Sequence, residues 1–171
     1  VMIEAERRVY ADRARWLGDP DFFKVPQNEL LDSLYLKKRW QDFTWSRATP
    51  SQAVTGGRIP GYESRETTHY SVVDPDGAAA AITTTLNNGY GSRVVVDGAG
   101  FLMNDEMEDF SAKPGTPNVF GLVGNEANAI QPGKRMLSSM TPTMVEKAGK
   151  LYLVVGTPGG STIITSVFQT I

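Results

Sequence analysis

Few kinds of side chain in this sequence could do chemistry. There is no cysteine, which excludes disulfides, thiolate metal sites and a cysteine nucleophile. His69 is the only histidine, so neither a histidine-rich metal site nor a Ser/His/Asp relay with a spare histidine is supported. We therefore expect a serine or threonine nucleophile whose base is not imidazole, and we expect no metal or other cofactor.

Taken alone, the threonine-rich run in the middle of the chain is weak evidence for a nucleophile. Thr67-Thr68-His69-Tyr70 opens a β-rich stretch, and such a run is by itself typical of an ordinary strand. A threonine hydroxyl is a weak nucleophile unless a base lies beside it, and a free α-amine is one known solution. That amine titrates at about 7.7–8.0, so an N-terminal threonine can supply both nucleophile and base near neutral pH.

The residues before this run indicate helices. Apolar side chains at helical spacing predict a first helix with one buried face, ended by Gly18-Asp19-Pro20; they are Met2, Ala5, Val9 and Trp16. A second helix is expected to open at Pro26 and to bury Leu30, Leu31 and Leu34. In the polar stretch 44–66 the apolar residues follow neither helical nor strand spacing. A structureless stretch of that length is usually functional or disordered.

The residues after this run indicate strands. Strands are predicted at 67–73, 78–86, 93–96, 102–103, 142–146 and 151–155, followed by a helix that starts near Ile163. Asp74-Pro75-Asp76-Gly77 is a strong turn signal. A three-residue hairpin loop with a bulge at Gly77 would place Thr67 opposite Thr85, within reach of a Thr–Thr hydrogen bond.

The composition of the chain makes some classes of binding partner unexpected. The net charge of −2 makes nucleic acid or an anionic membrane an unexpected partner, and no apolar run approaches the length of a membrane span. The 171 residues are enough for a compact core. Because the chain opens at Val1 in the middle of a helical pattern, we expect it to be a piece of a longer protein.

A set of motifs spread along the chain resembles the γ-glutamyltransferase family, in that family's order and spacing. The motifs are TTHYSVVDPDG, TLNNGYG, MEDFSAKPG, KRMLSSM and GTPGGS. The resemblance implies an α+β N-terminal-nucleophile hydrolase with a four-layer αββα sandwich, only partly covered by this chain. It also implies a cut between Glu66 and Thr67. Residues 1–66 would then end the large subunit, and residues 67–171 would begin the small catalytic subunit.

The resemblance also assigns roles to individual residues. Thr67 would be the nucleophile, Thr85 would orient its hydroxyl, and the amides of Gly159 and Gly160 would form the oxyanion hole. The α-ammonium of the γ-glutamyl donor would be held by Asn87, Glu106 and Asp109. The donor's α-carboxylate would be held by Ser138 and Ser139 and by a large-subunit arginine outside this chain. Asp105 and Glu108 match no family site and are expected to be surface charges.

Two departures from the family pattern concern loops. Residues 114–123 correspond to a lid over the pocket, and Phe120 stands where many bacterial members have tyrosine, which removes a hydroxyl from the lid. Met136 replaces a proline of the KRPLSSM motif and is expected to affect loop stiffness more than chemistry.

The implied function is γ-glutamyl transfer and hydrolysis of glutathione and related compounds, with water, amino acids or peptides as acceptors. The expected partners are the rest of both subunits, and the expected location is periplasmic or secreted. Two alternatives stay open. A related acylase, acting on cephalosporins or glutaryl compounds or processing poly-γ-glutamate, would keep the chemistry and change the substrate. An unprocessed, inert fragment would have no activity.

Overall fold

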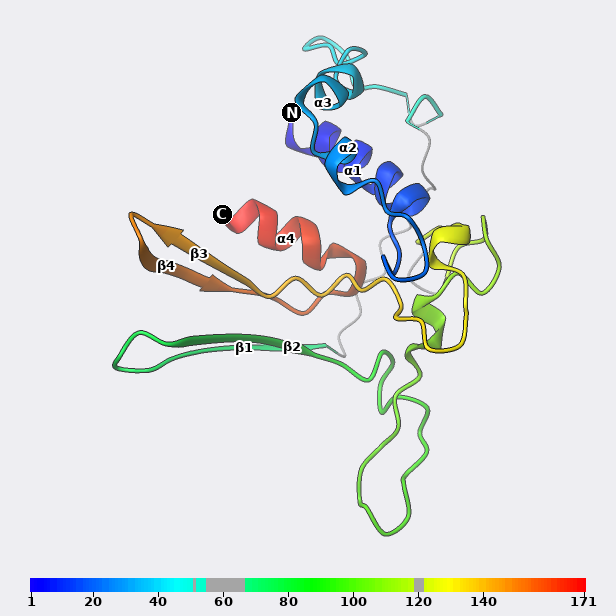
Figure 1. The fold of residues 1–171 in the computed structure, drawn as a ribbon, viewed down its shortest axis with the longest axis vertical. Coiled ribbons are helices and arrows are strands. Elements are labelled where there is room, and N and C mark those ends of the chain that lie inside the picture. Colours follow the sequence, from blue (N-terminus) through cyan, green and yellow to red (C-terminus); the bar gives the residue numbers. More distant parts are fainter. Residues whose placement is uncertain (51, 55–66, 119–121) are drawn as a thin grey trace. The chain divides into compact units, whose positions relative to one another are not determined.

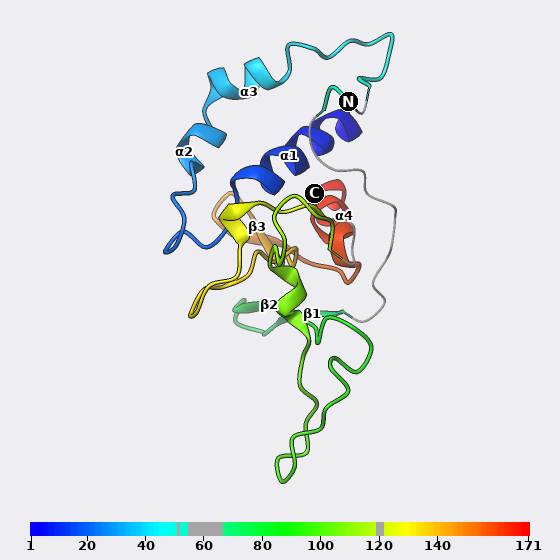
Figure 2. The same cartoon turned by 90° about the vertical axis from the view of Figure 1, so that its right-hand side faces the viewer.

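The computed structural model describes residues 1–50, 52–54, 67–118 and 122–171 (Figures 1 and 2). Its contacts divide the chain into two compact units, each built from two separate segments. The first unit comprises Val1–Pro60 and Glu108–Leu137, and the second comprises Gly61–Met107 and Ser138–Ile171. The predicted division at residue 66 concerns a covalent cut rather than packing, and it stays a prediction.

The first unit is helical. Helix α1 spans Met2–Trp16, as its apolar spacing predicted. The predicted buried face is wrong, because Met2 and Val9 are 46% and 56% exposed. The buried side of α1 instead carries Glu4, Arg8, Ala11 and Arg13. Polar groups can be buried there because the Arg8 guanidinium is paired with the carboxylates of Glu4 and Asp42.

The predicted second helix is two shorter ones, α2 (Gln27–Leu30) and α3 (Ser33–Arg39). Asp32 separates them: its carboxylate accepts hydrogen bonds from the amides of Leu34 and Tyr35 and so caps the start of α3. The expected burial of Leu31 and Leu34 is wrong, since they are 79% and 72% exposed. A 3-10 helix, η2 (Glu126–Asn128), completes the unit and packs against the end of α1.

The second unit contains two antiparallel hairpins. Strands β1 (Thr68–Val73) and β2 (Ala79–Thr84) form one, and β3 (Thr143–Lys147) and β4 (Lys150–Val155) form the other. The first hairpin turns as predicted: the Asp74 amide donates to the Ala78 carbonyl, and Gly77 has a φ of 88°. The strands predicted at 93–96 and 102–103 are reduced to a single bridge between Val95 and Leu102.

The second unit is layered. In the view of Figure 1 the β1–β2 hairpin lies below the β3–β4 hairpin, with β2 in contact with β4, and α4 (Ile163–Thr170) is drawn above β3–β4. Ile163 and Val167, one helical turn apart, are 1% and 5% exposed and form the buried face of α4. This order of sheet, sheet and helix is an α+β arrangement. Among the described residues, no helix is long and apolar enough to cross a membrane.

Candidate active site

Thr67 lies immediately before β1 and is only 8% exposed. In the β1–β2 ladder Thr68 pairs with Thr84 and His69 with Thr83, which is the register predicted from the turn. Continued by one step beyond the ladder, that register would set Thr67 opposite Thr85. The Thr85 hydroxyl accepts a hydrogen bond from the Asn87 amide at 3.0 Å, which fixes its oxygen. The Thr67–Thr85 hydrogen bond stays a prediction, and Glu66 lies outside the described residues.

His69 shares the strand face of Thr67 and is held by hydroxyls. Its Nδ1 lies 2.8 Å from the Thr83 hydroxyl, and its Nε2 lies 3.0 Å from the Ser71 hydroxyl. The imidazole also lies against Gly156, where an added Cβ would be 2.2 Å from ring carbon Cε1. Both ring nitrogens therefore have hydroxyl partners. This structural role could not be read from the sequence, because Ser71 and Thr83 look like ordinary strand residues.

The turn after β2 is organised by Asp105, whose assignment as a surface charge is wrong. Its carboxylate accepts hydrogen bonds from the amide and the side chain of Asn88, at 3.1 and 2.8 Å. Its carbonyl accepts one from the Asn87 side chain at 3.2 Å. Asn87 is 5% exposed and has a φ of 78°, a left-handed conformation that asparagine tolerates better than most residues. Asp105 thus positions Asn87, one of the predicted substrate contacts.

The predicted ammonium-binding carboxylates belong to one 3-10 helix, η1 (Glu106–Asp109). Burial raises the pKa of Glu106 above its ordinary value, and the neighbouring Asp105 carboxylate raises it further. A bound ammonium would offset both effects by favouring the ionised form of Glu106. Asp109 lies near the buried Arg13 guanidinium, whose pKa is lowered by burial and raised in part by Asp109.

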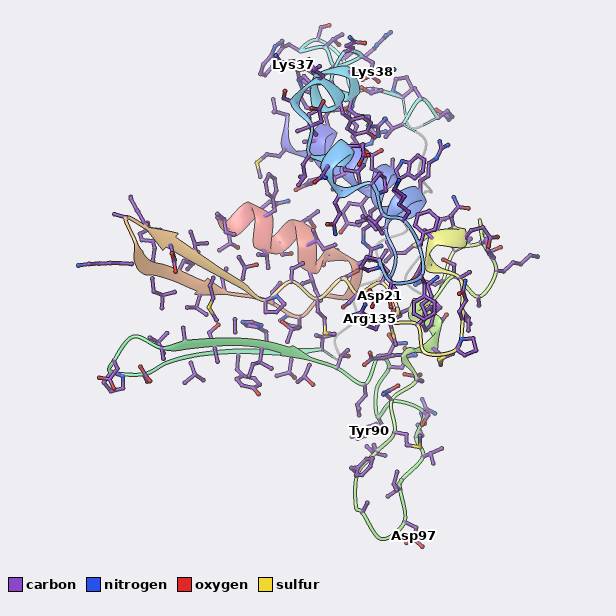
Figure 3. All side chains as sticks on the ribbon, viewed as in Figure 1. Asp21, Lys37, Lys38, Tyr90, Asp97 and Arg135 are labelled. Atoms are coloured by element: carbon purple, nitrogen blue, oxygen red, sulfur yellow. The ribbon has the colours of Figure 1, made fainter. Side chains whose placement is uncertain are left out.

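The serines predicted to hold the α-carboxylate follow a firmly anchored segment. The Ser138 hydroxyl accepts a hydrogen bond from the Met140 amide at 3.0 Å. Three residues earlier, Arg135 is held by the Asp19 carboxylate, which accepts from its amide and from its Nε, both at 2.9 Å. Arg135 also pairs with Asp21, as Figure 3 shows. The Arg135 hydrogen bonds hold the pKa of Asp19 well below its usual range.

The Gly159-Gly160 pair has a positive φ at both positions, which favours glycine. The φ angles are 137° at Gly159 and 54° at Gly160. The Gly159 carbonyl accepts hydrogen bonds from the amide and hydroxyl of Thr162, at 3.0 and 2.8 Å, which closes the turn into η3 (Gly160–Thr162) and α4. The structure therefore accounts for two glycines here, while their action as oxyanion donors stays a prediction. In the lid segment, Phe120 lies outside the described residues.

Comparison with known proteins places the chain in a family. The family model described as Gamma-glutamyltranspeptidase matches residues 1–171. A glutathione hydrolase proenzyme of Pseudomonas aeruginosa is 58% identical over 99% of the chain, and one of Escherichia coli is 54% identical over the same share. The chain spans about 30% of the length of these curated relatives.

Solved structures agree with the sequence comparison. The gamma-glutamyltranspeptidase of Pseudomonas nitroreducens complexed with L-DON matches with 65% identity and a TM-score of 0.58, covering 60% of this chain and 53% of that one. A T380A mutant of the Helicobacter pylori enzyme matches with 62% identity and the same TM-score, covering 60% and 55%. With the family model matched from end to end, the chain belongs to the gamma-glutamyltranspeptidase family.

Proposed function

We propose that the protein transfers and hydrolyses γ-glutamyl groups through an ester on Thr67, after cleaving itself between Glu66 and Thr67. The observation that carries this proposal is the position of Thr67 next to the start of β1, in a chain that the family model matches from residue 1 to residue 171. The residue is buried immediately before β1, and the register of the β1–β2 ladder, continued by one step, supports a place for Thr85 opposite it. These features suit a hydroxyl that must be held in one orientation to attack a carbonyl.

Cleavage would begin with the Thr67 hydroxyl attacking the carbonyl carbon of Glu66. The peptide C–N bond breaks as the acyl group moves from nitrogen to oxygen, and the threonine nitrogen takes up the hydroxyl proton. Water then hydrolyses the ester, giving the Glu66 carboxylate and a free Thr67 with both amine and hydroxyl. The step creates the base that the chain otherwise lacks.

Turnover would use the same hydroxyl on a γ-glutamyl amide. The Thr67 amine accepts the hydroxyl proton as the oxygen attacks the γ-carbonyl, and it returns that proton to the leaving amine. The amides of Gly159 and Gly160 stabilise the oxyanion. Water or the amine of an amino acid or peptide then attacks the ester, which releases glutamate or a new γ-glutamyl amide and restores Thr67.

Donor recognition would depend on the two charges of the γ-glutamyl group. Glu106 and Asp109, with Asn87, bind the α-ammonium, and Ser138 and Ser139 bind the α-carboxylate. We further propose that the remaining parts of both subunits complete the site, including the large-subunit arginine. The same family resemblance supports a four-layer αββα sandwich and a periplasmic or secreted location.

A related acylase is the second candidate, because an Acylase ACY 1 proenzyme of a Pseudomonas strain is 35% identical over the whole chain. The acidic residues of η1 favour a donor with a free α-ammonium over a glutaryl donor, which has none.

The experiment uses the full-length protein. Intact-mass analysis should show a break between Glu66 and Thr67, and the Thr67→Ala variant should stay a single chain. The cleaved protein should hydrolyse γ-glutamyl-p-nitroanilide faster than glutaryl-p-nitroanilide. Preference for the glutaryl compound would favour the acylase, and a single chain that persists under processing conditions would favour the inert fragment.

A further inference from the structure

Asn128 is a buried asparagine that joins two segments of the first unit. It is 5% exposed and ends η2. Its side-chain NH2 donates to the Asp109 carbonyl at 2.8 Å, and its side-chain oxygen accepts from the Leu137 amide at 3.0 Å. If the side-chain amide were reversed, its NH2 would face the Leu137 N–H and its oxygen would face the Asp109 carbonyl. These two partners therefore fix the orientation of the Asn128 side chain.

The two partners of Asn128 each adjoin a predicted substrate contact. Asp109 is itself an ammonium-binding candidate and is the last residue of η1, which also carries Glu106. Leu137 is directly followed in the chain by Ser138 and Ser139, the carboxylate-binding candidates. One side chain therefore sets the backbone at the end of η1 and the backbone that leads into the serine pair.

Asn128 is itself held firmly enough to act as a support. Its amide donates to the Asn125 carbonyl at 3.0 Å, and its carbonyl accepts from the Ser111 amide at 2.8 Å. The preceding residue, Ala127, is 1% exposed, and its carbonyl oxygen would lie 2.0 Å from a Cβ added at Gly18. The η2 backbone thus packs directly on the chain after α1, which leaves Asn128 little freedom to move.

The segment that Asn128 holds is also fixed on its other side. Asp19, whose carboxylate is fully buried, binds the amide and guanidinium of Arg135, two residues before Leu137. The labelled Arg135 and Asp21 lie together in Figure 3, where Asp21 adds a second carboxylate to the same guanidinium. The approach to the serine pair is therefore held by a charged clamp at Arg135 and by a neutral amide at Leu137.

We propose that Asn128 is a positioning residue for donor recognition, which fixes the backbone at Asp109 and the backbone entering Ser138 relative to one another. This inference rests on the proposed function, because it takes the binding of the donor's two charges as given. Bound charges are discriminated only when their partners are held to within a fraction of an ångström. Loss of Asn128 should therefore weaken donor binding and selectivity more than it slows the chemical step at Thr67.

The test compares Asn128→Asp, Asn128→Ala and the control Asn125→Asp in the full-length protein. Asn128→Asp keeps the shape and an acceptor for the Leu137 amide, but it sets an oxygen against the Asp109 carbonyl. Asn128→Ala removes both hydrogen bonds. Asn125→Asp makes the same chemical change at an exposed position at the start of η2, where the side chain forms no capping bond.

We expect cleavage after Glu66 to continue in all three variants. For γ-glutamyl-p-nitroanilide, KM should rise about 10-fold in Asn128→Asp and further in Asn128→Ala, while kcat falls by no more than about 3-fold. The preference for the γ-glutamyl over the glutaryl anilide should fall about 10-fold, because only the γ-glutamyl donor carries the ammonium. Asn125→Asp should match the unmodified protein in each measurement.

Asn128→Asp with an unchanged KM and an unchanged anilide preference would overturn the inference. So would Asn128 variants that all fail to give soluble, cleaved protein, because Asn128 would then be needed for folding rather than for positioning. If the unmodified protein itself lacks turnover or prefers the glutaryl anilide, the proposed function fails. If the unmodified protein prefers the γ-glutamyl anilide and Asn128→Asp keeps that preference, only the inference about Asn128 fails.

Discussion

Gly156 is the place where the loop after β4 meets the imidazole of His69. A Cβ added there would lie 2.2 Å from ring atom Cε1 and 2.3 Å from Nδ1, well inside normal contact. The φ of Gly156 lies outside the left-handed region, so alanine could adopt its backbone conformation without strain. The substitution Gly156→Ala therefore tests packing against His69 alone.

The cost of Gly156→Ala can be worked out for two responses of the ring. If the ring stays, the overlap must be relieved by backbone and side-chain shifts, which typically cost about 1–3 kcal/mol. If the ring swings away, the hydrogen bonds to Thr83 and Ser71 are lost, at about 0.5–1.5 kcal/mol each. Both responses predict a loss of about 1–3 kcal/mol in the free energy of unfolding.

A double-mutant cycle isolates this contact. Gly156→Ala, His69→Ala and the double variant are made in full-length protein that carries Thr67→Ala and so stays uncleaved, and their urea midpoints are compared with the parent. Because His69→Ala removes the ring, Gly156→Ala should then cost almost nothing, which gives a coupling of about 1–3 kcal/mol. An equal cost of Gly156→Ala with and without the ring would refute the reasoning.

Three further predictions concern catalysis and pH. Gly160→Ala, which forces a side chain into a φ of 54°, should lower kcat by about 100–1,000-fold if it displaces an oxyanion donor, and single-turnover rates of the cleaved protein would show this. Because the pKa of Glu106 is raised above 4.5, kcat/KM for a γ-glutamyl donor should increase as pH rises through that higher pKa, and Glu106→Gln should abolish the increase. The Arg8 hydrogen bond lowers the pKa of Glu4 from 4.5 to about 2, so the stability that Glu4 adds is present above pH 4.5 and is lost as pH falls toward about 2. The urea midpoints of the unmodified protein and Glu4→Gln should therefore differ most near pH 6 and converge at low pH.

Local signals were enough to predict much of the second unit. The Asp74–Gly77 turn fixes its own loop length, and the loop length fixes the register that pairs Thr68 with Thr84. The β3–β4 hairpin and α4 were likewise found where strand and turn residues indicated them. These elements depend on contacts between residues close in sequence, which is why pattern and turn chemistry could predict them.

The features that the sequence did not reveal depend on distant partners. Arg8 is buried on α1 because Asp42 and Thr49 supply its hydrogen bonds from more than thirty residues away. Asp105 looked like one more charge in an acidic run until the structure placed Asn88 against it. Neither pairing leaves a period or a spacing in the sequence. The one local signal that could have been used was Asp32, a helix-capping residue in the middle of the predicted second helix.

If the chain is cut after Glu66, the ion pair between Asp19 and Arg135 would join two separate chains. Asp19 lies before the cut and Arg135 after it, yet both belong to the first unit, as do Gly18 and Ala127, which also meet across the cut. Contacts that are intramolecular in the precursor would become contacts between subunits, already formed at the moment of cleavage. Dissociation of the two products would break these contacts within the first unit. The precursor would thus mature into a heterodimer without any step of association.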